Sequence, residues 1–193
     1  EGTKEFYARP IREVIRNKKL SIANPSGDGE GMSQKVVIEE LRMNLSEHDW
    51  FVYEDHYGTT EEKAFVKYFH SLVPELQKEY EEIYLVRNEQ LAELAIYDFD
   101  TGKRFEPDFL LFLRRGGQEE YEQRQIYIEV KGDHLLNLEN EKRKENFLRR
   151  ISEESLPVKV YADNYEYHIY GLSFFNKNHR QKEFEKEFRE KLL

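Results

Sequence analysis

Apolar residues recur at helical spacing in several segments of this chain. The strongest such pattern lies between Thr59 and Tyr80, and its apolar stripe comprises Ala64, Phe65, Tyr68, Phe69, Leu72, Val73 and Leu76. The sequence from Thr59 to Glu62 has the form of a capping box, which predicts that the helix begins there. Pro74 lies inside the pattern, so we expect a kink or break at that residue.

Four other segments have helical patterns: 5–19, 35–45, 136–151 and 183–193. The loop-forming run 24–31 follows the first of them. The segment 35–45 fits either a helical face or an extended chain, because its β-branched run favours extension, and we favour a helix.

Short apolar runs predict strands between these helices. They cover 83–86, 91–99, 107–113, 125–131, 158–161 and 167–175, with a turn at 100–102 and a loop at Gly116-Gly117. This order of elements predicts an α/β or α+β fold with helices flanking a central mixed sheet.

Charged residues stand at the ends of two of the predicted strands. Asp108 opens one strand, and Glu129 and Lys131 lie two residues apart at the end of the next. Side chains alternate along a strand, so Glu129 and Lys131 share a face, and Asp108 joins them if the strands are neighbours. Two converging carboxylates repel each other unless a cation binds between them, and oxygen ligands suit Mg²⁺ or Mn²⁺. With a lysine beside the metal, hydrolysis of a phosphodiester is the natural reaction.

A third carboxylate could come from the helix before the sheet, through Glu61 or Glu62. We prefer Glu62 because it leads the apolar stripe that faces the sheet. Its interpretation as the capping-box acid is equally good, so both remain open.

Composition limits the remaining choices. The 193 residues carry 30 Lys and Arg against 39 Asp and Glu, a net charge of −9, which does not favour nucleic-acid binding except through local patches. The chain has no cysteine and no apolar run long enough to span a bilayer, so we expect one cytoplasmic domain without disulfides or a membrane anchor. It opens at Glu1 rather than Met, which suggests a fragment of a longer chain. It lacks the phosphate-binding loop of ATPases, so we expect no ATP site.

One local basic patch lies on the predicted helix after the second of these strands, where residues 142–150 carry a charge of +5 − 1 = +4. Arg143 and Arg150 share a face there and are candidates for DNA backbone contacts, as is His134 after the strand. Ion pairing of this helix with its own glutamates is an equally good interpretation, and His134 is more simply a polar residue at a strand end.

These motifs resemble the PD-(D/E)xK nuclease superfamily. The matching residues are Pro107-Asp108 and Glu129-Val130-Lys131. Longer matches, at Asn88-Glu89, 105–109, 129–135 and Phe147-Leu148, resemble the nuclease domain of type III restriction (Res) subunits and related DEAD/DEAH helicases. The resemblance covers about residues 56–175, and this chain has Val130 where many relatives have proline.

The resemblance implies a restriction-endonuclease-like αβββαβ core and a Mg²⁺- or Mn²⁺-dependent DNA endonuclease at 56–193. It implies metal ligands at Asp108, Glu129, Val130 and Glu62 and a catalytic lysine at Lys131. Residues 1–55 would form a helical or linker segment leading to an ATP-driven helicase or translocase, and a modification subunit is a further expected partner. Two alternatives remain, namely a catalytically silent domain of this fold that binds DNA or a partner subunit, and an unrelated acidic interaction module in which the motif is coincidental.

Overall fold

The computed structural model describes residues 10–15, 31–89, 91–98, 102–117, 120–153, 158–159 and 165–193. The ends of the helix predicted at 5–19, most of the loop at 24–31, most of the turn at 100–102 and the end of the strand at 158–161 lie outside these residues.

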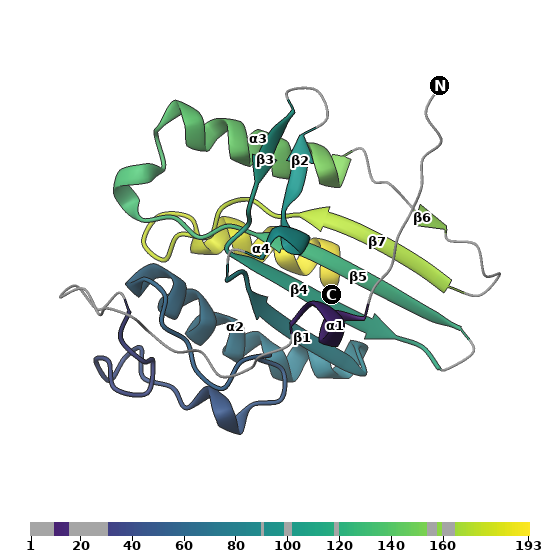
Figure 1. Ribbon diagram of the computed structural model, residues 1–193, viewed down its shortest axis with the longest axis horizontal. Helices are drawn as coiled ribbons and strands as arrows, with labels where there is room; N and C mark the ends of the chain where they lie inside the picture. The colour runs from purple at the N-terminus through teal and green to yellow at the C-terminus, as the bar shows by residue number, and fades with distance from the viewer. Residues whose placement is uncertain are drawn as a thin grey trace.

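A five-stranded mixed sheet forms the centre of the molecule (Figure 1). Its order is β1-β4-β5-β7-β6, and only β5 and β7 pair in parallel. The strands are β1 (Glu82–Arg87), β4 (Phe109–Arg115), β5 (Tyr121–Ile128), β6 (Val158–Lys159) and β7 (Tyr165–Gly171). A separate hairpin, β2 (Ile96–Asp98) and β3 (Lys103–Phe105), is inserted between β1 and β4.

Helices cover both faces of the sheet, so the predicted architecture of a mixed sheet flanked by helices is confirmed. One face packs against α2 (Thr60–Glu79) and α4 (Gln181–Leu192), and the ring centroids of Phe65 on α2 and Phe109 on β4 are 5.0 Å apart. The other face carries α3 (Glu139–Glu153), the β2–β3 hairpin and α1 (Ile11–Val14). Single 3₁₀ turns, η1 (Leu45–Glu47), η2 (Ala92–Leu94) and η3 (Asp133–Leu135), join these elements.

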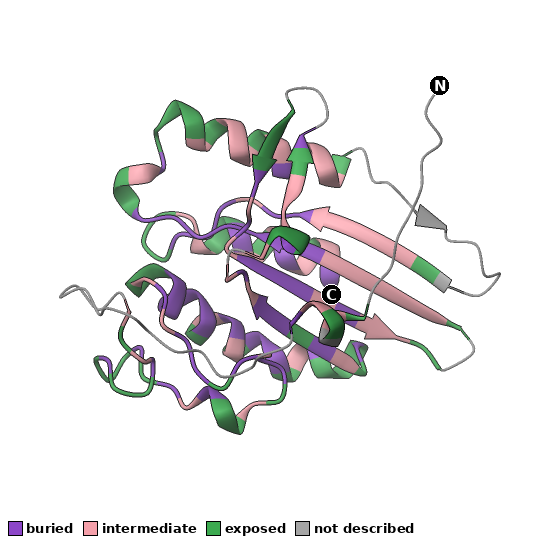
Figure 2. Ribbon diagram, viewed as in Figure 1, coloured by how far each residue is buried: buried purple, intermediate pink, exposed green. Residues whose placement is uncertain are grey.

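Strand β4 is the most deeply buried element of the sheet (Figure 2). Phe109, Leu110, Leu111 and Leu113 are each at most 1% exposed, although consecutive residues point to opposite faces. This double burial explains why the sequence reads there as a continuous apolar run. It also makes the beginning of β4, where Asp108 lies, a rigid position.

The start of α2 is as predicted. The hydroxyl oxygen of Thr59 accepts a hydrogen bond from the backbone N–H of Glu62 at 3.2 Å, which satisfies a donor that the helix itself cannot pair. The prediction that the helix breaks at Pro74 is wrong, because α2 continues through this residue to Glu79. The flanking residues Val73 and Leu76 are buried in the core, and their packing outweighs the loss of one backbone hydrogen bond.

The helix predicted at 35–45 is also wrong, because these residues form successive turns that lead into η1. Val36 and Ile38 are 62% and 61% exposed, whereas Val37 and Leu41 pack with Ala64 of α2. The buried amide of Gln34 donates to the carbonyl oxygen of Leu41 at 3.0 Å and fixes this turn-rich path.

Strand boundaries shift by a few residues from their predicted positions. The strand predicted at 91–99 is a 3₁₀ turn followed by the short β2, and β5 begins earlier than predicted and ends at Ile128. Beyond that end, Val130 forms an isolated parallel bridge to Phe175. The domain boundary at residue 56 stays a prediction, but six described residues of the preceding segment contribute to the same core: Ile15, Met43, Leu45, Trp50, Phe51 and Tyr53.

Candidate functional site

Asp108 and Glu129 meet where β4 begins and β5 ends. The pairing of Phe109 with Ile128 brings the residue before β4 next to the residue after β5. The backbone N–H of Asp108 donates to Glu129 Oε2 at 3.2 Å, and the backbone N–H of Val130 donates to Asp108 Oδ2 at 2.8 Å. The two carboxylates are thus held side by side by backbone donors.

Lys131 lies on the same face of the chain as Glu129, as the alternation predicted. Its Nζ is 2.7 Å from Glu129 Oε1 and 2.9 Å from Glu141 Oε2 on α3. Lys144 of the same helix reaches these acids too, with its Nζ 3.5 Å from Glu129 Oε1 and 3.1 Å from Glu141 Oε1. We call Glu129, Lys131, Glu141 and Lys144 the charge ring.

The charge ring fixes the protonation of its lysine. Burial alone would lower the pKa of Lys131, but the neighbouring Glu129 and Glu141 carboxylates raise that pKa above its usual value. The ammonium is therefore charged at neutral pH, so it can donate hydrogen bonds and stabilise negative charge.

The surroundings of the two carboxyl groups, Asp108 and Glu129, disfavour their charged forms. Burial raises the pKa of Asp108 well above its usual value, and the negative charges of Glu129 and Glu62 raise it further. Burial also raises the pKa of Glu129, although the charge of Lys131 opposes the shift. Carboxylates that destabilise each other in this way bind a proton or a cation readily.

Replacing Asp108 with asparagine is expected to stabilise the fold at neutral pH in the absence of metal. Because the pKa of Asp108 is higher in the folded state, its stability contribution is fully present below the unfolded pKa and is lost as pH rises through the folded pKa. Each unit of that shift corresponds to about 1.4 kcal/mol, which the neutral amide recovers. Urea unfolding at pH 7.5 and at pH 4 measures this, and an Asp108→Asn gain that does not grow with pH would contradict it.

Glu62 approaches the pocket beside Asp108 from the first turn of α2. Its Oε2 is 2.9 Å from Arg87 Nε and 3.3 Å from His56 Nε2. Burial opposes ionisation, but the hydrogen bond from His56 and the charge of Arg87 lower the pKa of Glu62 to about 2. Its side chain is therefore an ionised member of the site, whereas Glu61 is exposed and lies near Gly132.

A polar pocket of about 390 Å³ opens beside Asp108. Its lining residues are Glu62, Arg87, Asn88, Glu89, Glu106, Pro107 and Asp108. Four of these side chains are carboxylates and one is a guanidinium, so the pocket has the charge of a cation-binding site.

The donor set next to this pocket fits Mg²⁺ or Mn²⁺. Within the described ranges, no three Asp, Glu or His side chains are arranged to hold a metal ion. Mg²⁺, however, commonly uses one or two carboxylates and fills its other positions with water and substrate oxygens. Asp108, Glu129 and the backbone carbonyl of Val130, which lies on the same side of the strand as the N–H that contacts Asp108, offer such oxygens.

The three predicted DNA contacts do not join this site. Arg150 pairs at 3.0 Å with Asp98 of the hairpin, which lies outside α3. Lys142 pairs with Glu139 at 3.2 Å, as the ion-pairing interpretation of α3 expects. Arg143 is partly buried, and no hydrogen-bond partner of its Nε lies in the described part of the chain. His134 lies exposed in η3, beyond the charge ring.

Sequence reasoning missed four residues of the site: His56, Arg87, Glu141 and Lys144. Glu141 and Lys144 carry a weak signal, since an acid and a base three residues apart follow the Glu-x-Lys motif on the next helix. Arg87 is the last residue of β1 and pairs with Phe109 at the start of β4. Its position at the end of a strand next to β4 was the only sequence signal that Arg87 belongs to the site.

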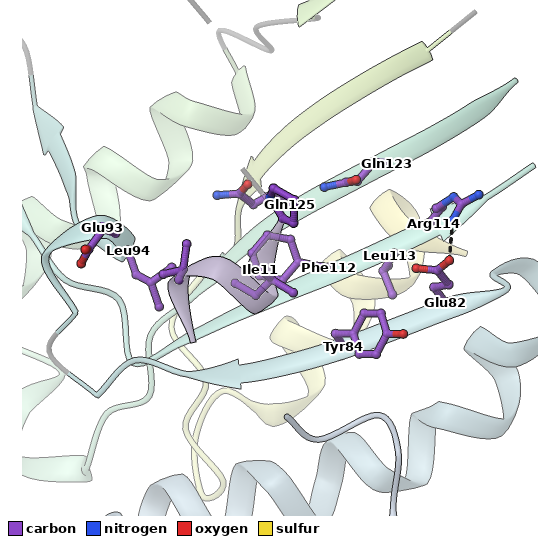
Figure 3. Close-up of a pocket in the computed structure, with 12 residues that line it drawn as sticks. Ile11, Glu82, Tyr84, Glu93, Leu94, Phe112, Leu113, Arg114, Gln123 and Gln125 are labelled. Carbon is purple, nitrogen blue, oxygen red and sulfur yellow. Dashed lines mark hydrogen bonds and ion pairs between the residues drawn. The ribbon is translucent and has the colours of Figure 1, made fainter. Parts of the chain in front are cut away.

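A second pocket, of about 540 Å³, lies on the sheet face that α1 crosses (Figure 3). The figure shows Ile11 of α1 directed at Phe112, with Gln125 beside it. Its charged pair, Glu82 and Arg114, is satisfied internally. Because its polar groups do not converge on a point, we do not take it as the functional site.

Among the described residues, none of the helices combines the length and the apolar composition that a membrane-spanning segment needs.

Comparison with known proteins identifies a family. Residues 33–192 match a family model described as HI_1054_C, C-terminal domain. The chain is also similar to a Haemophilus influenzae protein named "Uncharacterized protein", with 29% identity over 193 residues. That match covers 95% of this chain and 38% of the relative, so the chain spans well under half of the relative's length. No solved structure matches the chain.

Proposed function

The chain belongs to the HI_1054_C C-terminal domain family, and we propose that it is a metal-dependent endonuclease domain that hydrolyses phosphodiester bonds in DNA. The observation that carries this proposal is the convergence of Asp108, Glu129 and Lys131 at the ends of two adjacent strands. The order α2-β1-β4-β5-α3-β7, with the β2–β3 hairpin set aside, supports a restriction-endonuclease-like αβββαβ core.

Asp108, Glu129 and the carbonyl of Val130 would hold Mg²⁺ or Mn²⁺, with Glu62 nearby. When bound, such an ion polarises a phosphoryl oxygen and lowers the pKa of a water molecule. Lys131 donates from its charged Nζ to the phosphate and stabilises the negative charge that develops there. Glu141 holds that Nζ at 2.9 Å, so the ammonium is oriented before substrate arrives.

Glu62 has a separate task in this proposal. Arg87 and His56 occupy its Oε2, which orients the carboxylate and leaves Oε1 to accept a hydrogen bond from water at the pocket. Because the pKa of Glu62 is about 2, this carboxylate stays ionised at physiological pH.

The wider setting follows from the same proposal. The relative is much longer than this chain, which leaves room for an ATP-driven helicase or translocase in the same protein. We therefore propose a cytoplasmic type III restriction enzyme or related defence helicase, with DNA as substrate and a modification subunit as a further partner.

Plasmid cleavage tests the activity. We expect the purified chain to nick supercoiled DNA in the presence of Mg²⁺ or Mn²⁺. We expect EDTA to abolish this nicking, and the Asp108→Asn variant to lack it. Asp49→Asn is the matched control, because Asp49 is exposed and lies outside the site. Cleavage that is insensitive to EDTA, or equal in the two variants, would refute the proposal.

One observation favours a second candidate, a silent domain of this fold that only binds DNA or a partner subunit. Oε1 of Glu129 is already contacted by the ammonium groups of Lys131 and Lys144, so a metal ion must compete with them. This candidate predicts DNA binding without cleavage, which the same assay and a binding measurement separate from an active nuclease.

A further inference from the structure

The carboxylate of Glu129 is covered by other groups of the protein, and its side chain is 2% exposed. Its Oε2 accepts a hydrogen bond from the backbone N–H of Asp108 at 3.2 Å. Its Oε1 lies 2.7 Å from Lys131 Nζ and 3.5 Å from Lys144 Nζ. Glu129 can therefore bind a cation only if it gives up one of these contacts.

The contact with Lys144 is the easiest of the three to give up. The N–H of Asp108 belongs to the backbone beside the buried strand β4, and the side chain of Lys131 is only 9% exposed. The side chain of Lys144 is 29% exposed, and its distance to Glu129 is the longest of the three. A lysine has a flexible four-carbon stem, so its ammonium can swing toward solvent without moving the backbone.

Lys144 remains at the site when it leaves Glu129, because Glu141 holds it there. Lys144 Nζ lies 3.1 Å from Glu141 Oε1, and Lys131 Nζ lies 2.9 Å from Glu141 Oε2. One carboxylate thus holds two ammonium groups side by side. An ammonium has three donors, so Lys144 released from Glu129 has donors to spare, and charge-assisted hydrogen bonds to phosphate oxygens are strong.

We propose that Lys144 is a second phosphate-binding lysine of this site. It pairs with Glu129 in the metal-free protein, and in the metal-bound protein it donates to a non-bridging oxygen of the DNA phosphodiester next to Lys131. The inference rests on the proposed function, because the cation and the phosphate are those of the proposed nuclease. It requires that loss of Lys144 change the affinities for metal and for DNA in opposite directions.

Lys144→Met tests this, because methionine keeps most of the stem and removes the ammonium. Affinity for Mn²⁺, measured by calorimetry without DNA, is expected to rise by about tenfold, since a competing positive charge has left Glu129. Affinity for a fluorescein-labelled DNA duplex is expected to fall by about tenfold, since a charge-assisted hydrogen bond is lost. Fluorescence anisotropy in saturating Ca²⁺ measures the second affinity with every variant carrying the same cation.

The control is Lys142→Met, which removes the same charge from an exposed position of α3. Should Lys144→Met melt far below the wild type, Lys144→Gln takes its place with the same two signs expected. If the wild type binds Mn²⁺ and DNA but the Lys144 variant matches Lys142→Met in either affinity, the inference is overturned and the proposed function stands. A wild-type chain that binds neither Mn²⁺ nor DNA would overturn both.

Discussion

Lys131→Met is expected to reduce the rate of metal-dependent DNA cleavage by about 10²- to 10³-fold, the usual effect of removing one preorganised charge from a reaction centre. The methionine keeps most of the side-chain volume but loses the ammonium that lies 2.7 Å from Glu129 and 2.9 Å from Glu141. Initial rates of supercoiled plasmid nicking in Mg²⁺, with an EDTA blank, measure the change.

The matched control is Lys142→Met, because Lys142 is on the same helix as Lys144 but is exposed and pairs only with Glu139 among the described residues. Thermal unfolding of both variants separates a lost reaction from a lost fold, and the charge of Lys144 remains near Glu129 to limit the damage. Equal cleavage by the two variants would mean that Lys131 takes no part in the reaction.

The meeting of Asp108, Glu129 and Lys131 could be predicted because it depends on short-range rules. Both motifs lie at the ends of apolar runs, side chains alternate along a strand with period two, and strands that follow each other in sequence usually pair. Only the register of β4 against β5 had to be supplied by the structure. A slip of one residue would have turned Asp108 away from Glu129.

The rest of the site depends on how distant segments dock. Glu141 reaches Lys131, and Lys144 reaches Glu129, only because α3 crosses the sheet next to these residues. Helical periodicity does not state where a helix lies. His56 is fully buried in a turn-rich segment whose polar side chains replace regular secondary structure, as in its contact with Gln34 at 3.0 Å. Such side-chain pairing leaves no periodic trace in a sequence.

The same dependence on docking suggests that a residue remote from the chemistry controls the site. Gly171 ends β7 directly beneath α3, and a Cβ placed there would lie 2.3 Å from the carbonyl oxygen of Leu148 and 2.7 Å from its Cα. The contact is reinforced by Ser152, whose hydroxyl donates to the carbonyl oxygen of Gly171 at 2.5 Å and accepts from its N–H at 3.0 Å. Only glycine permits this approach of helix and strand backbones.

Gly171→Ala is therefore expected to lower the free energy of unfolding by about 3 kcal/mol, the upper end of the usual range for overpacking, because backbone cannot move aside as a flexible side chain can. Urea unfolding measures this loss, and Gly117→Ala, whose added methyl group meets no atom within 4 Å, is the control. If α3 shifts to relieve the clash, Glu141 and Lys144 move with it and leave Lys131 without part of its support. Cleavage by the folded fraction should then fall as well, whereas unchanged stability of Gly171→Ala would show that α3 does not pack this closely on β7.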